Sequence, residues 1–240
     1  RERIKETGVD LRLNTEVTAE ELRNSDFDEI VVATGVVPRI PDIPGIDHPK
    51  VLTYPQVLLR EVEVGEKVAI IGAGGIGFDV AEFLAEPGES VTLHPEKWME
   101  EWGVDPTLSK PGGVTTPHPE KSPRTIYLMQ RKTTRPGANL GKTTGWIHRS
   151  SLRHRGVQMM AGVQYVKIDD AGLHIRRGDK DMVLDVDHIV LCTGQLSENR
   201  LYHELRDGDK PVHLIGGAEL AAELDAKRAI NQGVRLAASL

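Results

Sequence analysis

The sequence predicts an α/β protein in which two related units of strand and helix are nested, one inserted in the other. A glycine-rich turn at 72–77 joins an apolar run to a helical pattern. On either side of this turn stand two near copies of one segment, DEIVVATG at 28–35 and DHIVLCTG at 187–194. The residues upstream of each copy, 5–12 and 153–160, share a helix end, a glycine and a strand pattern. We therefore expect the order unit one, unit two, unit one.

A length of 240 residues with 39% hydrophobic content is enough for a sizeable core in one or two domains. The 30 basic and 36 acidic residues give a net charge of -6, which provides no field to attract nucleic acid or anionic lipid. No apolar run approaches the roughly 20 residues that span a bilayer, and the start lacks the pattern of a signal peptide. The composition predicts no nucleic-acid partner, no membrane partner and a cytoplasmic location.

The chain has one cysteine, Cys192, which excludes an internal disulfide and any cluster or zinc site built from several thiolates of this chain. Because this residue lies in an apolar run, we expect its side chain to be buried. The histidines are scattered without the spacing of metal ligands, and no nucleophile stands with a base and an orienting group. The sequence therefore predicts neither catalytic nor metal-binding residues.

The outer unit is expected to begin with a helix at 1–8 and a half-buried strand at 9–17, where apolar and polar residues alternate. The run at 29–33 is apolar on both faces, which is typical of a strand in a covered parallel sheet. Prolines recur through 36–55, and each fixes φ and removes a backbone donor. This segment is therefore predicted to be an extended crossing between domains, without helix or central strand.

The inner unit is expected to alternate strands with helices around an irregular insertion. Its predicted elements are a strand at 67–71, a helix at 78–84, a strand at 125–129, a helix at 145–154 and short strands over 157–189, with a hairpin at 168–173. The insertion at 87–123 is rich in proline and shows no sustained periodicity. A strand at 213–215 and a long helix at 218–239 are expected to return to the outer unit.

The glycine turn has the spacing G-x-G-x-x-G between a strand and a helix, which is the context that a dinucleotide requires. Gly72 permits the tight turn, Gly74 lets backbone amides approach a pyrophosphate, and Gly77 lets the helix pack on the strand. Gly75 belongs to the same turn. The helix start supplies free amides and partial positive charge. We expect these glycines to bind the phosphates of a dinucleotide, whereas the alternative is a tight turn without a ligand.

The next strand of such a unit ends near the adenosine ribose, where acidic residues favour NAD and basic residues favour NADP. Two segments compete for this place: 90–93, which has the usual spacing but is followed by proline, and 125–129. We prefer the second. Arg131 and Lys132 would then hold the 2′-phosphate of NADPH through charge-assisted hydrogen bonds. The alternative is a solvated strand end.

The two Thr-Gly pairs, Thr34 with Gly35 and Thr193 with Gly194, lie at carboxyl ends of predicted strands, where open α/β sheets bind ligands. Gly216 and Gly217 have the same character after the strand at 213–215, although a plain turn is the alternative there.

The segment 140–149, LGKTTGWIHR, contains glycine, lysine and threonine but lacks the earlier glycine of a phosphate-binding loop. Thr143 or Thr144 is explained by helix capping. A role of this loop in contacting a dinucleotide or acyl-CoA remains the open alternative.

Several segments together resemble the carboxyl-terminal region of bacterial NADPH-dependent 2,4-dienoyl-CoA reductases, which are flavoproteins related to old yellow enzyme. The resemblance covers essentially the whole chain. Its most specific parts are LGKTTGWIHR and the proline-rich insertion before QRK; the others are DEIVVATGVVP, GAGGIGFD, IDDAGLHI and HLIGGAELAAELDAKRAINQG.

This resemblance implies a Rossmann-like NADPH-binding domain at 61–196, with its insertion at about 87–124, inside a partial FAD-binding domain at 1–60 and 197–240. It also implies a barrel with FMN, a 4Fe–4S cluster and the catalytic acid upstream of Arg1. Hydride would pass from NADPH to FAD, and electrons would continue through the cluster to FMN to reduce an unsaturated fatty acyl-CoA. The chain would thus be an NADPH-dependent oxidoreductase region without the barrel that reduces the substrate.

For FAD, the resemblance implies that Val17 lies near the adenine, together with Thr34 and Gly35, and that Gly216 and Gly217 lie on the flavin side. Gly217 stands where related flavoproteins carry aspartate. Two other interpretations stay open: a region like that of trimethylamine-type amine dehydrogenases, which binds ADP or nothing in the inner unit, and a nucleotide-binding module without turnover.

Overall fold

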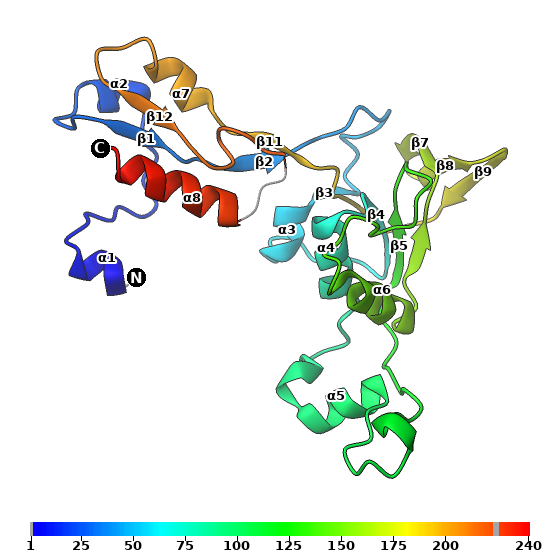
Figure 1. Ribbon diagram of the computed structural model, residues 1–240. Helices are drawn as coiled ribbons and strands as arrows, with labels where there is room; N and C mark the ends of the chain where they lie inside the picture. Colours follow the sequence, from blue (N-terminus) through cyan, green and yellow to red (C-terminus); the bar gives the residue numbers. More distant parts are fainter. Residues whose placement is uncertain (1, 223–225) are drawn as a thin grey trace. The chain divides into compact units, whose positions relative to one another are not determined.

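The structure is a computed structural model that describes residues 2–222 and 226–240. The chain forms two compact units, an outer one of Arg1–Val37 with Gln195–Leu240 and an inner one of Pro38–Gly194 (Figure 1). The outer unit is thus interrupted by the inner one, in the order expected from the repeat. Residues 38–60 group with the inner unit, whereas the sequence suggested a boundary at residue 60.

The inner unit is built on a parallel sheet with the strand order β3-β10-β4-β5-β6. These strands are β3 (Val51–Thr53), β4 (Lys67–Ile71), β5 (Thr125–Met129), β6 (Gln158–Met160) and β10 (His188–Leu191). Each strand expected at 67–71, 125–129 and near 189 is confirmed. The pairing of β4 with β5, from Lys67 opposite Thr125 to Ile71 opposite Met129, makes β5 the second strand of the unit.

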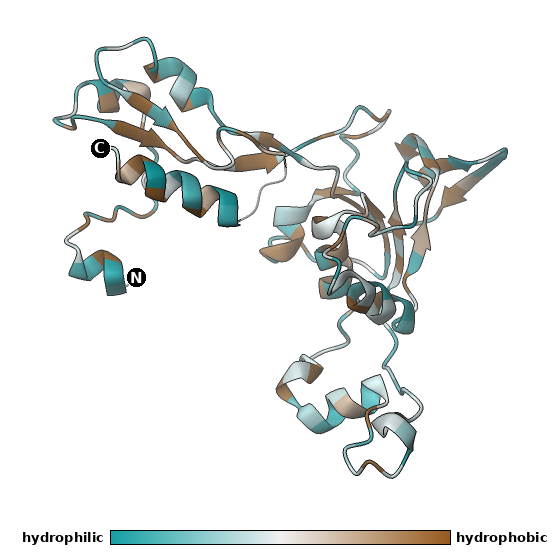
Figure 2. Cartoon of the chain, in the orientation of Figure 1, coloured by the Kyte–Doolittle hydropathy of each residue, from teal (hydrophilic) through white to brown (hydrophobic). Residues whose placement is uncertain are grey.

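Two layers cover this sheet, and alternate residues of β4 face each of them. Val68 and Ile70 pack with the helices α3 (Tyr54–Leu58), α4 (Gly75–Ala85) and α6 (Gly145–His154). Ala69 and Ile71 pack with the antiparallel strands β7 (Val163–Asp169) and β8 (Gly172–Arg177), which β9 (Lys180–Leu184) extends. All four residues are at most 1% exposed, and Figure 2 colours much of this sheet as hydrophobic. The run is apolar because both faces of the strand are covered.

The proline-rich crossing is more ordered than predicted. It contains β2 (Val36–Pro38), β3 and α3, because its prolines occupy positions that tolerate them. Pro55 lies in the first turn of α3, where no backbone donor is needed. Pro38 ends β2, which pairs only with β11 (Gln195–Ser197) in the described part of the chain.

The insertion is not wholly irregular either. It holds α5 (Pro95–Trp102), which Pro95 begins and Gly103 ends with a φ of 65°, flanked by the short helices η1 (Val91–Leu93) and η2 (Pro111–Gly113). Eight residues are too few to show a clear helical period, so α5 was not predicted from the sequence. Because 91–93 is helical rather than extended, the choice of 125–129 as the second strand is confirmed.

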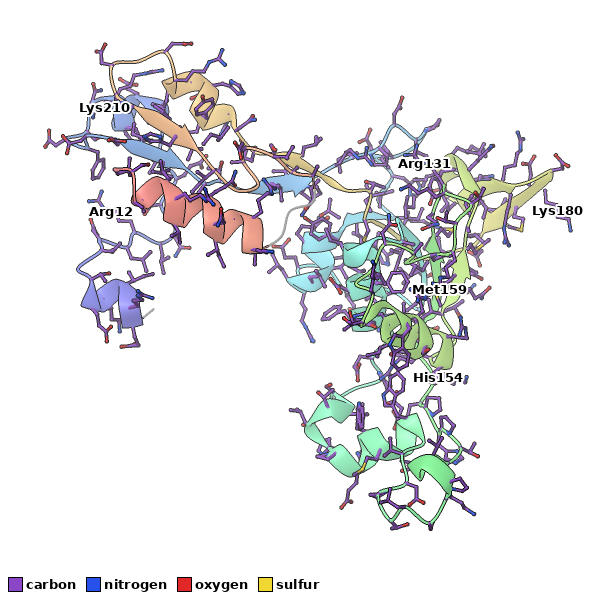
Figure 3. The ribbon with its side chains drawn as sticks, viewed as in Figure 1. Arg12, Arg131, His154, Met159, Lys180 and Lys210 are labelled. Carbon is purple, nitrogen blue, oxygen red and sulfur yellow. The ribbon has the colours of Figure 1, made fainter. Side chains whose placement is uncertain are left out.

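Arg155 ties the insertion to the end of α6. The basic residues Arg149, Arg153 and Arg155 near this helix end have the sequence pattern of a solvated surface, but Arg155 is only 6% exposed. Its guanidinium lies 3.2 Å from a carboxylate oxygen of Glu101 and 3.5 Å from one of Glu86. The ring of Trp102 lies beside that of His154, which is labelled in Figure 3, with centroids 5.8 Å apart and an angle of 56° between the ring planes. Arg155 is therefore buried, although its sequence is typical of a solvated surface, because it pairs with the carboxylates of Glu101 and Glu86.

Replacing this buried cation tests the attachment. Arg155→Met is expected to lower the free energy of unfolding by about 1–3 kcal/mol, because two partly buried carboxylates lose their partner. Urea unfolding measures it. Arg153→Met, at an exposed position of the same helix end, should change stability by less than about 0.5 kcal/mol. Equal losses in both variants would contradict the assignment.

The outer unit is held by β1 (Ile30–Val32) and β12 (Val212–Leu214), which pair in parallel. This pairing confirms that the last segment returns to the first. The small core joins Ala19 of α2 (Ala19–Arg23), Ile30, Val32 and Leu205 of α7 (Arg200–Leu205). The other helices are α1 (Glu2–Glu6) and α8 (Ala226–Ala237). No helix in the described ranges is long and apolar enough to cross a membrane.

Two expectations for this unit are wrong. Residues 9–17 form no strand, and their apolar side chains, Val9, Leu11, Leu13 and Val17, are 41–62% exposed. Alternation yields a strand only beside a neighbour, and none pairs with this segment in the described chain. The long helix begins at Ala226 rather than 218: residues 218–222 form no helix, and 223–225 lie outside the described residues. Figure 2 shows the apolar stripe of α8, where Ile230 and Val234 are each 64% exposed.

Candidate nucleotide-binding site

The turn after β4 needs glycine at the first and last glycine positions of the G-x-G-x-x-G pattern, Gly72 and Gly77, for steric reasons. Gly72 has a φ of +114°, and a Cβ there would lie 2.0 Å from the carbonyl oxygen of Cys192. A Cβ on Gly77 would lie 1.8 Å from the carbonyl oxygen of Gly72. Both roles inferred from the sequence, the tight turn and the close packing of helix on strand, thus have a geometric counterpart.

Gly74 and Gly75 differ from these two because space is open in front of them. A Cβ on either residue would meet no atom within 4 Å. Gly74 is the N-cap of α4 and has no side chain to accept from the first helical amides. These amides and the helix dipole are therefore free to receive an anion. The arrangement fits the pyrophosphate of a dinucleotide.

One pocket of about 720 Å³ brings the glycine turn together with the basic strand end. Its lining includes Gly72, Gly74 and Gly75 from the turn, and Arg131 and Lys132 from the segment after β5. The two strands end level with one another, so the residues that follow them meet at the same edge of the sheet. Arg131 is labelled in Figure 3, and both cations are exposed to solvent. The charge pattern fits a phosphate group carried beyond the pyrophosphate.

Two predicted residues of the inner unit do not line this pocket. Gly77 lies behind the turn, where its role is packing. Gly194 has a φ of +100° and lies under the guanidinium of Arg39, which donates to the carbonyl of Thr193 over 2.8 Å. Arg39 itself lines the pocket and was missed, since its contact spans 154 residues of sequence and follows no local pattern.

Tyr165 of β7 is a second pocket residue that the sequence did not reveal. Its hydroxyl is buried and has no hydrogen-bond partner among the described residues. Burial raises the pKa of this phenol, and the nearby charge of Arg131 opposes the rise only in part. The group is therefore a protonated donor beside the basic end of the pocket.

Cys192 follows β10 and is 7% exposed, as expected for a buried small residue. Burial, with a smaller effect of Asp79, raises the pKa of its thiol to about 12. A protonated, solitary thiol cannot take part in disulfide exchange within this chain.

The buried, protonated state of Cys192 predicts that its thiol reacts slowly. In the native chain Cys192 is expected to react with an aromatic disulfide reagent at pH 8 at least about 100-fold more slowly than in urea, because little thiolate is present. Absorbance of the released thiolate measures both rates. Similar rates in the two states would show that the thiol is accessible and ionised.

The outer unit contains a separate groove of about 420 Å³ that Val17 and Thr34 line together with Phe27 and Val31. Gly35 follows with a φ of +78° and open space at its Cβ position. Gly216 and Gly217 are buried outside this lining, and the amide of Gly216 donates to the side chain of Gln232 over 2.8 Å. Of the residues expected near FAD, the structure therefore brings Val17 and Thr34 into one groove.

The segment 140–149 takes part in the pocket through its first residue, which continues the lining formed by 137–139. Leu140 lines the pocket, whereas Trp146 is 56% exposed and lies outside the lining. Thr144 is the N-cap of α6, as one interpretation required, but its side chain makes no capping hydrogen bond.

Residues 1–214 match the family described as pyridine nucleotide-disulphide oxidoreductase. The chain belongs to this family. FAD and NAD(P)H binding is expected of its members, and the α/β class with parallel sheets predicted from the sequence is confirmed. The disulphide of the family description has no counterpart here, because the chain has a single cysteine.

Three of the similar proteins are two reductases and a dehydrogenase. Cinnamate reductase of Clostridium sporogenes is 27% identical over 215 residues, which is 90% of this chain and 27% of that protein. A complex of 2-naphthoyl-CoA reductase has a TM-score of 0.77 and 24% identity, over 98% of this chain and 30% of that one. Histamine dehydrogenase of Rhizobium sp. 4-9 has a TM-score of 0.66 and 18% identity, over 95% of this chain and 33% of that one. The chain thus spans a third or less of each.

Proposed function

We propose that this chain is the NADPH- and FAD-binding electron-input region of a 2,4-dienoyl-CoA reductase. One observation carries the proposal: the pocket of the inner unit joins an uncapped, glycine-lined helix start to two exposed cations after the neighbouring strand. A dinucleotide with a third phosphate matches both features. The basic residues follow the same strand end at which an acidic residue would favour NAD.

The residues of the chain bind and orient; they donate no catalytic proton. The amides at the start of α4 hold the pyrophosphate, Arg131 and Lys132 hold the 2′-phosphate, and the groove at Val17 and Thr34 contacts FAD. When bound, NADPH supplies a hydride and FAD accepts it. The role of the protein is to bind and orient one cofactor in each unit.

The substrate class rests on the resemblance of LGKTTGWIHR and the insertion to dienoyl-CoA reductases. The names cinnamate reductase and 2-naphthoyl-CoA reductase, carried by two relatives, are compatible with reduction of an unsaturated acid or thioester. FMN and an iron–sulfur cluster would lie in a part of the enzyme that these residues do not form, and the cytoplasm is the proposed location.

Calorimetric titration of the purified chain with NADPH and NADH tests the nucleotide assignment. NADPH is expected to bind at least about 10-fold more tightly. Flavin absorbance of the same sample, followed without oxygen, should bleach on addition of NADPH. In the intact enzyme, oxidation of NADPH should depend on a 2,4-dienoyl-CoA. Equal affinity for the two nucleotides would refute the NADPH site, and NADPH oxidation indifferent to the thioester would refute the substrate.

The similarity to histamine dehydrogenase favours one alternative, a nucleotide-binding region of the amine-dehydrogenase type. In that case ADP should bind as tightly as NADPH, and NADPH should leave the flavin oxidised. A chain that binds nucleotide but no flavin would instead be a module without turnover.

A further inference from the structure

Gln130 is the first residue after β5, at the place where NAD-binding units carry an acidic side chain for the ribose. Here the side chain is neutral and lines the pocket. Its amide nitrogen lies 3.1 Å from the carbonyl oxygen of Lys132, 2.5 Å from that of Thr134 and 3.3 Å from the Thr134 hydroxyl. Since carbonyl oxygens only accept, the amide nitrogen and not the amide oxygen must face this loop.

The backbone of the same segment is fixed from the other side. The backbone amide of Gln130 donates to the carbonyl of Met160 over 3.0 Å, and the backbone amide of Gly162 donates to the carbonyl of Lys132 over 2.9 Å. The carbonyl of Lys132 therefore accepts two hydrogen bonds, one from the backbone amide of Gly162 and one from the side-chain amide of Gln130. The loop is held by its main chain while the side chains of Arg131 and Lys132 stay exposed at the pocket.

We infer that Gln130 is a positioning residue for the 2′-phosphate: its amide clamps the backbone from Lys132 to Thr134 and so presents Arg131 and Lys132 together to the ligand. This inference rests on the proposed NADPH site and adds the residue that orders it. A side chain that touched only the ribose would serve NADH and NADPH alike. A clamp on the basic loop affects NADPH selectively, because only NADPH carries the group that this loop binds.

Two variants remove the clamp in different ways. Gln130→Leu keeps the approximate volume and deletes the donors. Gln130→Glu keeps the shape but turns a carboxylate oxygen toward two carbonyls and adds negative charge beside the phosphate site. Thr133→Val is the matched control, because Thr133 is exposed in the same loop but does not line the pocket.

Calorimetry should show NADPH binding weakened about 10-fold in Gln130→Leu and about 100-fold in Gln130→Glu, with NADH changed less than about 3-fold. Without nucleotide, hydrogen exchange at the amides of residues 131–135 should accelerate in both variants. Thr133→Val should match the unaltered chain in both measurements.

Equal weakening of NADPH and NADH, or unchanged exchange in the loop, would overturn the role of Gln130 while leaving the NADPH site intact. An unaltered chain that fails to prefer NADPH would overturn the proposed function itself, and this inference with it. Failure of the Gln130 role is thus measured on the variants, whereas failure of the proposed function is measured on the unaltered chain.

Discussion

Gly77→Ala is expected to abolish folding of the inner unit or to cost more than about 4 kcal/mol of its stability. The added methyl would lie 1.8 Å from the carbonyl oxygen of Gly72 and 3.4 Å from the side chain of Leu128. The first contact is to backbone in the tight turn, so no side-chain rotation relieves it. Circular dichroism during thermal and urea unfolding measures the loss.

Gly74→Ala separates packing from ligand binding at the same turn. A methyl on Gly74 meets no atom within 4 Å, and the φ of -87° suits alanine, so the fold should persist within about 1 kcal/mol. The methyl would occupy the space in front of α4 that the pyrophosphate needs. NADPH and NADH should both bind at least about 10-fold more weakly. A stable Gly77→Ala, or a Gly74→Ala that binds normally, would contradict this division of roles.

The sequence predicted the inner unit well where local pattern and tertiary environment agree. The segments 67–71 and 125–129 are apolar because both faces of the sheet are covered, and glycine spacing marked the start of α4. The repeated segment also identified β1 and β10, each followed by a Thr-Gly pair at a strand end. Periodicity and glycine placement are properties of a short stretch, so they can be read without the fold.

The remaining features depend on contacts between distant segments. Alternation at 9–17 gave a false strand because no partner pairs with it in the described chain. The burial of Arg155 could not be read from its own segment, because its carboxylate partners are Glu101 in the insertion and Glu86 at the end of α4. Arg39 and Tyr165 reach the pocket only after the sheet is assembled. The charges at Arg131 and Lys132 could be predicted, but the clamp that orders them could not, since it needs the geometry of the loop.

Removing both cations should give the largest change in nucleotide preference. In Arg131→Ala/Lys132→Ala, two charge-assisted hydrogen bonds of about 1.5–3 kcal/mol each are lost from the 2′-phosphate. NADPH affinity is then expected to fall roughly 100- to 10,000-fold, whereas NADH, which lacks this phosphate, should change less than about 3-fold. Both side chains are exposed, so salt screening places the effect at the lower end in high ionic strength.

Lys142→Ala is the control, since this lysine is exposed in the loop before α6 but does not line the pocket. It should leave both affinities unchanged and so exclude a general effect of positive charge. Titration at two salt concentrations adds a second criterion: the preference for NADPH should shrink as salt rises in the unaltered chain and be small at both concentrations in the double variant. If the double variant retained its preference, Arg131 and Lys132 would not be the residues that bind the 2′-phosphate, and Arg39, which also lines the pocket, would be the next cation to replace.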